Sequence, residues 1–93
     1  MTIRRFNYRF YGLDAVQFTG DNEAEVQELT GPADFYVLEE DEREDDATAT
    51  LLETKNSAYV PVFTGDWVTR TDKGFLTVYP REDWDKFFVE VEK

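Results

Sequence analysis

The chain contains neither cysteine nor histidine. Without cysteine it can form no disulfide, no thiolate metal site and no Cys nucleophile. Without histidine it lacks the commonest general base, the commonest zinc ligand and the Ser-His-Asp arrangement of hydrolases. Carboxylate pairs remain as a source of acid–base chemistry, but with 21 Asp and Glu residues such pairs arise by chance. We therefore predict a protein that is not an enzyme and that uses no cofactor and no metal.

Long apolar stretches are also missing. The N-terminal sequence MTIRRFNYRF lacks the apolar region of a signal peptide. No window of the chain approaches the length of a membrane span. We therefore expect a soluble cytoplasmic protein that has no membrane partner.

Aromatic residues are abundant enough to build a core. A chain of 93 residues makes one domain, residues 1–93, and buries only a modest fraction of its surface. Phe, Tyr and Trp make up 16% of the chain, and each buries a large apolar area. This composition predicts a small globular fold and not a disordered chain.

The negative charge is concentrated in one part of the chain. The net charge is -11, and residues 21–46 carry twelve acidic residues against one basic residue, Arg43. Such a surface repels nucleic acid and anionic membranes and attracts basic partners. Arginines alternate with aromatic residues near the N-terminus, a pattern that can stack on bases, but a strand with one charged face is the favoured interpretation, and the negative charge of the protein supports it.

Two short helices are predicted. Asp21 or Asn22 can cap a helix over residues 22–30, and Glu25 then occupies a capping-box position. Gly31 and Pro32 end that helix. Pro80 starts a second helix, along which four apolar residues recur at helical spacing and are expected to pack on the sheet. These residues are Trp84, Phe87, Phe88 and Val91.

The remaining segments have the patterns of strands. Alternation over residues 6–10 predicts a first strand, and Gly12 a bend or bulge. DFYVLEE at 34–40 and TATLLET at 48–54 predict a hairpin, whose acidic connection, residues 39–47, we expect to be a mobile loop or hairpin tip. Pro61 indicates an edge strand or an irregular segment, and residues 75–79 form a further strand. We therefore predict an α+β fold, a small twisted antiparallel sheet of about five strands with two short helices, the C-terminal one packed on the sheet.

The tetrapeptide Phe-Thr-Gly-Asp occurs twice, within VQFTGDN at 16–22 and VFTGDWV at 62–68. A duplication would repeat the elements that follow, but a helix is predicted after the first copy and a strand after the second. A phosphate-binding loop needs more glycines and a lysine. Thr-Gly-Asp favours turns, because Gly tolerates positive φ and Asp bonds nearby amides. We interpret the copies as two separate turns.

The acidic run EEDEREDD at 39–46 has three interpretations. It can be a solvated loop that keeps the protein soluble. It can instead imitate the charge of DNA and occupy a basic groove on a nucleic-acid-binding protein. It lacks the spacing of an EF-hand, so calcium binding is disfavoured. The acidic residues of this candidate partner-binding surface are Glu39, Glu40, Asp41, Glu42, Glu44, Asp45 and Asp46.

Two segments resemble a family of small bacteriophage and prophage proteins known for a PGDYG-type motif. LDAVQFTGDN followed by EAEVQEL is similar to the opening of these proteins, and TGDWVTRTDKGFLTVYPREDWDKFFVEV to their closing part. Thr64 replaces the usual proline, Phe75-Leu76 replaces a Glu-Phe pair, and the acidic insert has no counterpart. The resemblance implies a phage origin and an α+β fold, but no activity. It places Gly65, Asp66, Trp67 and Gly74 at motif positions.

From these features we predict a small acidic phage accessory protein of the host cytoplasm. It would act without catalysis by binding a host or phage protein, and not by binding nucleic acid directly. One alternative is a DNA mimic that inhibits a basic, nucleic-acid-binding host protein through residues 39–46 and the 22–30 helix. A second alternative is a virion or assembly component. The sequence leaves a homo-oligomer open.

Overall fold

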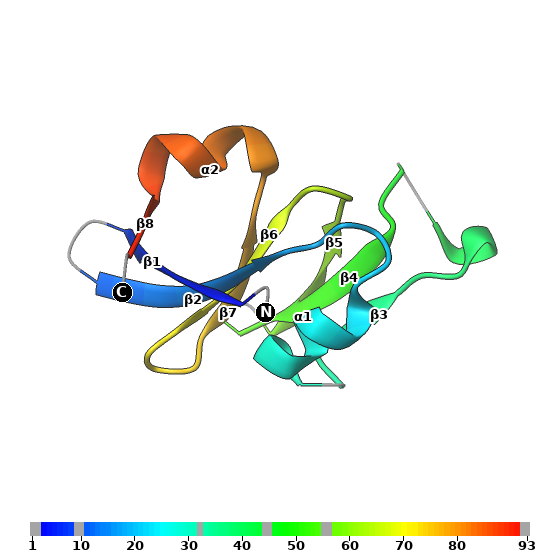
Figure 1. The fold of residues 1–93 in the computed structure, drawn as a ribbon. Helices are drawn as coiled ribbons and strands as arrows, with labels where there is room; N and C mark the ends of the chain where they lie inside the picture. The colour runs from blue at the N-terminus through cyan, green and yellow to red at the C-terminus, as the bar shows by residue number, and fades with distance from the viewer. Residues whose placement is uncertain (1–2, 9–10, 32, 44–45, 55–56, 92–93) are drawn as a thin grey trace.

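The computed structural model describes residues 3–8, 11–31, 33–43, 46–54 and 57–91, and within them eight strands, two α-helices and one short 3-10 helix (Figure 1). Along the chain these elements are β1 (Arg4–Tyr8), β2 (Tyr11–Gln17), α1 (Glu23–Thr30), β3 (Phe35–Val37), η1 (Glu40–Glu42), β4 (Ala49–Glu53), β5 (Ala58–Val62), β6 (Trp67–Thr71), β7 (Leu76–Tyr79), α2 (Arg81–Phe87) and β8 (Val89–Glu90).

The strands form two antiparallel sheets. The larger sheet has the order β7-β6-β2-β1-β8, and the smaller sheet has the order β3-β4-β5. The α+β class with antiparallel pairing is thereby confirmed. The single sheet of about five strands is wrong, because the hairpin predicted over residues 34–54 joins β5 in a sheet of its own. Sequence periodicity identifies strands but does not say which strands pair.

The larger sheet is covered on both faces, which explains why so many residues of β2 are buried. Val16 and Val68 face the small sheet and α1, where they join Phe35, Leu51 and Val62 in one core. On the other face, Phe6, Leu13, Ala15 and Trp67 pack with residues of the C-terminal helix. Figure 1 shows α2 above this sheet and α1 on its other side.

Helix α1 forms where the sequence predicts it. Val26 and Leu29 are buried, and Glu23 and Glu25 lie in the first turn, where the helix dipole favours negative charge. The expected capping box is wrong. Asn22 precedes the helix, but its side-chain oxygen accepts from the Thr19 amide at 2.8 Å, and its side-chain nitrogen donates to the Gln17 carbonyl at 2.8 Å. The asparagine therefore braces the preceding turn.

Helix α2 is shorter than predicted. Trp84 and Phe88 pack against the larger sheet, but the helix ends at Phe87, whose side chain is 51% exposed. The Phe88 backbone is already extended, and the chain returns as β8 to pair with β1. The predicted helical stripe that includes Phe87 and Val91 is therefore wrong. Pairing with a sheet edge satisfies backbone groups that a longer helix would have used.

Two further predictions concern single residues. Gly12 does not form a bend or bulge: it lies inside β2 and pairs with Asn7 of β1. Pro61 lies in β5, which is an edge strand of the small sheet, as its proline predicts. Of the aromatic residues expected in the first strand, Phe6 is buried, whereas Phe10 lies outside the described residues.

The aromatic packing of α2 generates a stability prediction. We expect Trp84→Ala to lower the free energy of unfolding by about 3–5 kcal/mol, because the buried indole stacks on both Trp67 and Phe88. Phe87→Ala on the same helix is the control, and its loss should stay below about 1 kcal/mol because that ring is half exposed. Chemical denaturation of both variants measures the difference. Equal losses would contradict the packing described here.

Candidate functional site

The two Phe-Thr-Gly-Asp segments lie directly against one another. The Phe18 amide donates to the Asp66 carbonyl at 2.8 Å, and the Gly65 amide donates to the Phe18 carbonyl at 2.7 Å. The Gln17 side chain adds a bond to the Gly65 carbonyl at 3.0 Å. The repeated tetrapeptide is therefore a pair of turns that hydrogen-bond to each other, a contact that the sequence did not reveal. We call these segments, residues 18–21 and 63–66, the paired turns.

Both turns depend on glycine. Gly20 has φ of 100° and Gly65 has φ of 101°, in the left-handed region that other residues rarely adopt. The Asp66 amide donates to the Phe63 carbonyl at 2.9 Å, which closes the second turn around Gly65 at its third position. A Cβ atom on Gly20 would lie 3.4 Å from the Thr64 hydroxyl, so the turns are also in side-chain contact.

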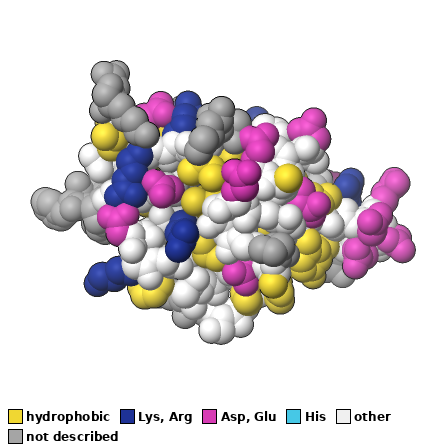
Figure 2. All heavy atoms as spheres, turned by 60° about the horizontal axis from the view of Figure 1, so that its bottom comes forward, with side chains coloured by type: hydrophobic (Ala, Val, Ile, Leu, Met, Phe, Trp, Pro, Cys, Tyr) yellow, Lys and Arg dark blue, Asp and Glu magenta, His cyan; other side chains and the backbone are white. Residues whose placement is uncertain are grey.

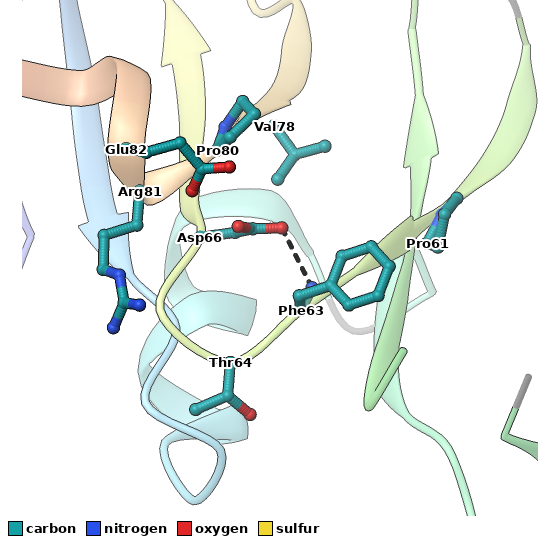
Figure 3. A pocket seen from close by; sticks show the side chains of 8 residues that line it. All are labelled: Pro61, Phe63, Thr64, Asp66, Val78, Pro80, Arg81 and Glu82. Atoms are coloured by element: carbon teal, nitrogen blue, oxygen red, sulfur yellow. Dashed lines mark hydrogen bonds between the residues drawn. The ribbon is translucent and has the colours of Figure 1, made fainter. Parts of the chain in front are cut away.

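The Asp66 carboxylate completes the second turn. It accepts a hydrogen bond from the Phe63 amide at 2.9 Å, and a further backbone bond comes from Arg81 at the start of α2 (Figure 3). Burial raises the pKa of Asp66, and the nearby Glu82 carboxylate adds to the increase. The backbone hydrogen bonds from Phe63 and Arg81 and the positive charge of Arg81 act in the opposite direction and lower the pKa. Figure 3 shows the Arg81 guanidinium extending away from the carboxylate.

A pocket of about 430 Å³ lies beside Asp66. Pro61 and Phe63 line one side of it, and Val78, Pro80 and Glu82 line the other (Figure 3). Its most buried charged group already serves two backbone amides. This arrangement joins the second turn to the start of α2.

The other motif residues serve the core and a hairpin. Trp67 stacks on Trp84 with ring centroids 4.5 Å apart, and Phe6 meets its ring edge-on at 5.3 Å. The Arg4 guanidinium lies 5.1 Å from the Trp67 ring. Gly74 lies in the turn between β6 and β7 with φ of 87°, and its amide donates a hydrogen bond to the Thr71 carbonyl at 2.8 Å. Gly65, Asp66 and Trp67 are brought together, whereas Gly74 lies at the far end of β6.

The acidic run lies on the connection between β3 and β4. Glu39, Glu40, Asp41 and Glu42 are all exposed, and we call them the acidic turn. The Glu42 amide donates to the Glu39 carbonyl at 2.9 Å, the Glu39 amide donates to the Glu42 carboxylate at 3.1 Å, and the Arg43 Nε donates to the Leu38 carbonyl at 3.2 Å. Asp46 is exposed, whereas Glu44 and Asp45 lie outside the described residues. The mobility expected of residues 39–47 stays a prediction.

The carboxylates of the acidic turn do not converge on a point. Within the part of the chain that the structure describes, no group of three or more acidic residues is arranged to hold a metal ion. Figure 2 shows acidic side chains gathered at the projecting end of the molecule, near hydrophobic side chains, while most Lys and Arg in this view lie toward the other end.

Sequence reasoning missed an exposed aromatic surface on the small sheet. Tyr36 is 41% exposed, Tyr59 is 53% exposed and Phe63 is 38% exposed. Thr50 on β4 pairs with Tyr36 on one side and with Pro61 on the other, so these residues share one side of the sheet. Spacing by two in YVPVF, residues 59–63, was the available signal. We call Tyr36, Thr50, Tyr59, Pro61 and Phe63 the outer face.

A groove of about 330 Å³ runs along the outer face to the acidic turn. Thr50, Tyr59, Pro61 and Phe63 line it together with Leu38, Ala47 and Glu42. The two tyrosine rings lie on opposite edge strands with centroids 5.9 Å apart and meet edge-on. The groove therefore combines apolar walls with one carboxylate from the acidic turn.

The N-terminal arginines are engaged in ion pairs. Arg4 lies 3.4 Å from the Glu90 carboxylate, and Arg5 reaches both Asp14 at 3.1 Å and Asp72 at 2.7 Å. These contacts link β1 to β8, to β2 and to the turn after β6. Both arginines therefore have structural partners. Arg4 lies over the Phe6 and Trp67 rings, so the expected strand with one charged face is confirmed only for Arg5.

The geometry of Asp66 predicts a pH-dependent effect. Because its pKa is raised in the folded protein, the unfolded chain releases this proton first, so its contribution to stability falls as pH rises from its ordinary pKa of 3.8 through the raised value. Asp66→Asn keeps an acceptor oxygen and cannot ionise. We expect its stability relative to the natural protein to improve between about pH 4 and about pH 7.

Asp66→Ala is the matched comparison. It removes the acceptor and leaves two backbone amides unsatisfied, so we expect a loss of about 1–3 kcal/mol relative to Asp66→Asn. Urea unfolding of the three proteins at both pH values gives the free energies. Equal stability of the Ala and Asn variants would refute the bracing role of Asp66.

No protein-family model, no curated protein and no solved structure matches this chain. The resemblance to the phage family with the PGDYG-type motif therefore stays a prediction. Among the described residues, neither α-helix has the length and apolar character needed to cross a membrane.

Proposed function

We propose that this chain is a phage-encoded accessory protein of the host cytoplasm that acts, without catalysis, by binding a host or phage protein. The contact surface is the outer face of the small sheet. The phage origin rests on the resemblance of residues 13–29 and 62–91, and the binding role rests on the surface described above.

The observation that carries this proposal is the exposure of three aromatic rings and a proline on one side of a three-stranded sheet. Solvent-exposed aromatic groups lose favourable burial, so a contiguous set of them is typical of an interaction surface. Tyr is also enriched among the residues that contribute most binding energy at interfaces. Pairing of β3 and β5 with β4 holds Tyr36 and Tyr59 in a fixed register.

A non-catalytic role is supported by the chemistry of the polar groups. The chain has neither histidine nor cysteine. Among the described residues, burial raises the pKa of one aspartate, Asp66, which accepts backbone hydrogen bonds that hold a turn and the start of α2. These bonds support a structural role for Asp66.

A second candidate function is a DNA mimic that binds a basic protein. The observation that favours it is the exposure of all four carboxylates of the acidic turn at the projecting end of the molecule (Figure 2). Such a mimic binds through charge, so its affinity falls steeply as salt rises. A partner held by the outer face is bound mainly by apolar burial and tolerates salt.

Affinity purification from host cells separates the two candidates. Tagged natural protein is compared with a face variant, Tyr59→Ala with Phe63→Ala, and with a charge variant, in which the acidic turn carries Gln and Asn in place of Glu and Asp. If the proposed function holds, we expect the face variant to capture at least about tenfold less partner than the natural protein, because two interface anchors have been removed. The charge variant should retain it at about 0.5 M salt.

The control is Phe75→Ala, which removes a ring that is as exposed as Tyr59 but lies beyond β6. It should capture the partner as the natural protein does. Loss of capture in the charge variant alone, with release at high salt, would support the DNA mimic and contradict the outer face. Thermal unfolding of every variant establishes that it is folded.

A further inference from the structure

We infer that the partner segment seated on the outer face is cationic, with an apolar side chain that enters the groove and Lys or Arg beside it that faces the acidic turn. This inference rests on the proposed function and specifies the chemistry of the partner. It is carried by a groove that the outer face lines together with Glu42, the last residue of an acidic turn whose four residues are exposed.

The groove favours an apolar side chain. Tyr59, Pro61 and Phe63 form one wall, and Leu38 and Ala47 stand at its other end. Its floor offers little polar chemistry, because Thr50 is almost fully buried and its hydroxyl donates to the Val60 carbonyl at 3.2 Å. At about 330 Å³ the groove is at the lower end of pockets that hold small ligands, and it suits one or two side chains of a larger partner.

The acidic turn sets the charge of the partner. Glu42 lines the groove, and Glu39, Glu40 and Asp41 precede it within one turn of 3-10 helix. Arg43, the base that follows, directs its Nε to the Leu38 carbonyl, on the backbone of the turn. A cation beside the groove gains attraction from this cluster, whereas an anionic segment is repelled. The net charge of -11 extends the same preference over a longer range.

The edges of the small sheet are already occupied or blunted, so the partner lies on the face and does not add a strand. At the β3 edge, the Glu23 carboxylate accepts from the Val37 amide at 2.7 Å, and the Gln27 side chain donates to the Phe35 carbonyl at 2.8 Å. At the β5 edge, Pro61 has no amide hydrogen to donate. These devices are typical of sheets that avoid pairing along an edge.

A second copy of this chain is a poorer occupant of the groove than a cationic segment, because of its charge. It would bring an identical acidic turn and the same net charge of -11 toward the groove. Like charges placed across an interface oppose association. Light scattering tests this occupant directly: a dimer of the natural protein that Tyr59→Ala dissociates would overturn the inference.

The test is a selection of random twelve-residue peptides displayed on a carrier and captured by the immobilised protein. Peptides that also bind the face variant Tyr59→Ala with Phe63→Ala are removed. We expect the retained peptides to carry a net positive charge and an apolar residue next to Lys or Arg. Retained peptides that are neutral or acidic, or no retained peptides at all, would overturn the inference.

A direct measurement then assigns the charge. One retained peptide is titrated by fluorescence anisotropy against the natural protein, the Phe75→Ala control and a double variant, Glu40→Gln with Glu42→Gln. The double variant should bind about three- to tenfold more weakly at low salt, as loss of two exposed ion pairs implies, and its affinity should depend less on salt. Equal affinity and equal salt dependence for the double variant and the natural protein would overturn the inference.

The outcomes distinguish this inference from the proposed function. If the face variant loses its cellular partner but the selection fails or yields acidic peptides, the outer face still binds protein and only the cationic chemistry is wrong. If the face variant captures the partner as the natural protein does, the proposed function fails, and the inference fails with it.

Discussion

The two backbone hydrogen bonds between the paired turns are the contact on which the other features depend. They join the end of β2 to the start of β6, 50 residues further along the chain, through Phe18 and the Gly65–Asp66 peptide. Two sheets have to diverge at this point, because β5 belongs to the small sheet and β6 to the large one. A turn with glycine in the left-handed region reverses the chain in the space available.

The consequences extend in both directions from this contact. Phe18 is fully buried and meets Phe35 of the small sheet edge-on with ring centroids 5.3 Å apart, so the first turn helps to anchor one sheet on the other. Asp66 continues into Trp67, which enters the aromatic cluster under α2. Phe18 and the segment Gly65-Asp66-Trp67 therefore connect the two cores. This gives a structural reason for the succession of Gly, Asp and Trp.

The sequence predicts local structure well where one periodicity dominates. Val26 and Leu29 identify α1, and Pro61 correctly places β5 at an edge. The errors arise where tertiary contacts decide the outcome. Phe87 and Val91 fit a helical stripe, but pairing of β8 with β1 ends the helix first. Asn22 is a good capping residue, but the backbone of the first turn uses its side chain instead.

The candidate site was only partly predictable for the same reason. The acidic turn is visible in the sequence as EEDEREDD, because it is a continuous run of charge. The outer face is assembled from β3, β4 and β5, and its residues are separated in the sequence by strands that also contribute to the core. An alternation such as Tyr59-Val60-Pro61-Val62-Phe63 shows which residues share a side. It does not show which side the rest of the protein covers.

The position of the acidic turn also resolves a conflict between solubility and binding. Exposed tyrosines on a small sheet favour association with other apolar surfaces, including those of other copies. Blunted edges prevent growth of the sheet, but they do not protect its outer face. Glu42 lines the groove, and the four exposed carboxylates of the acidic turn favour repulsion between chains of the same charge. The repulsion is selective, because a cationic segment experiences attraction from the same groups. In the proposed function, the acidic turn would oppose self-association and leave the aromatic surface open to a basic partner.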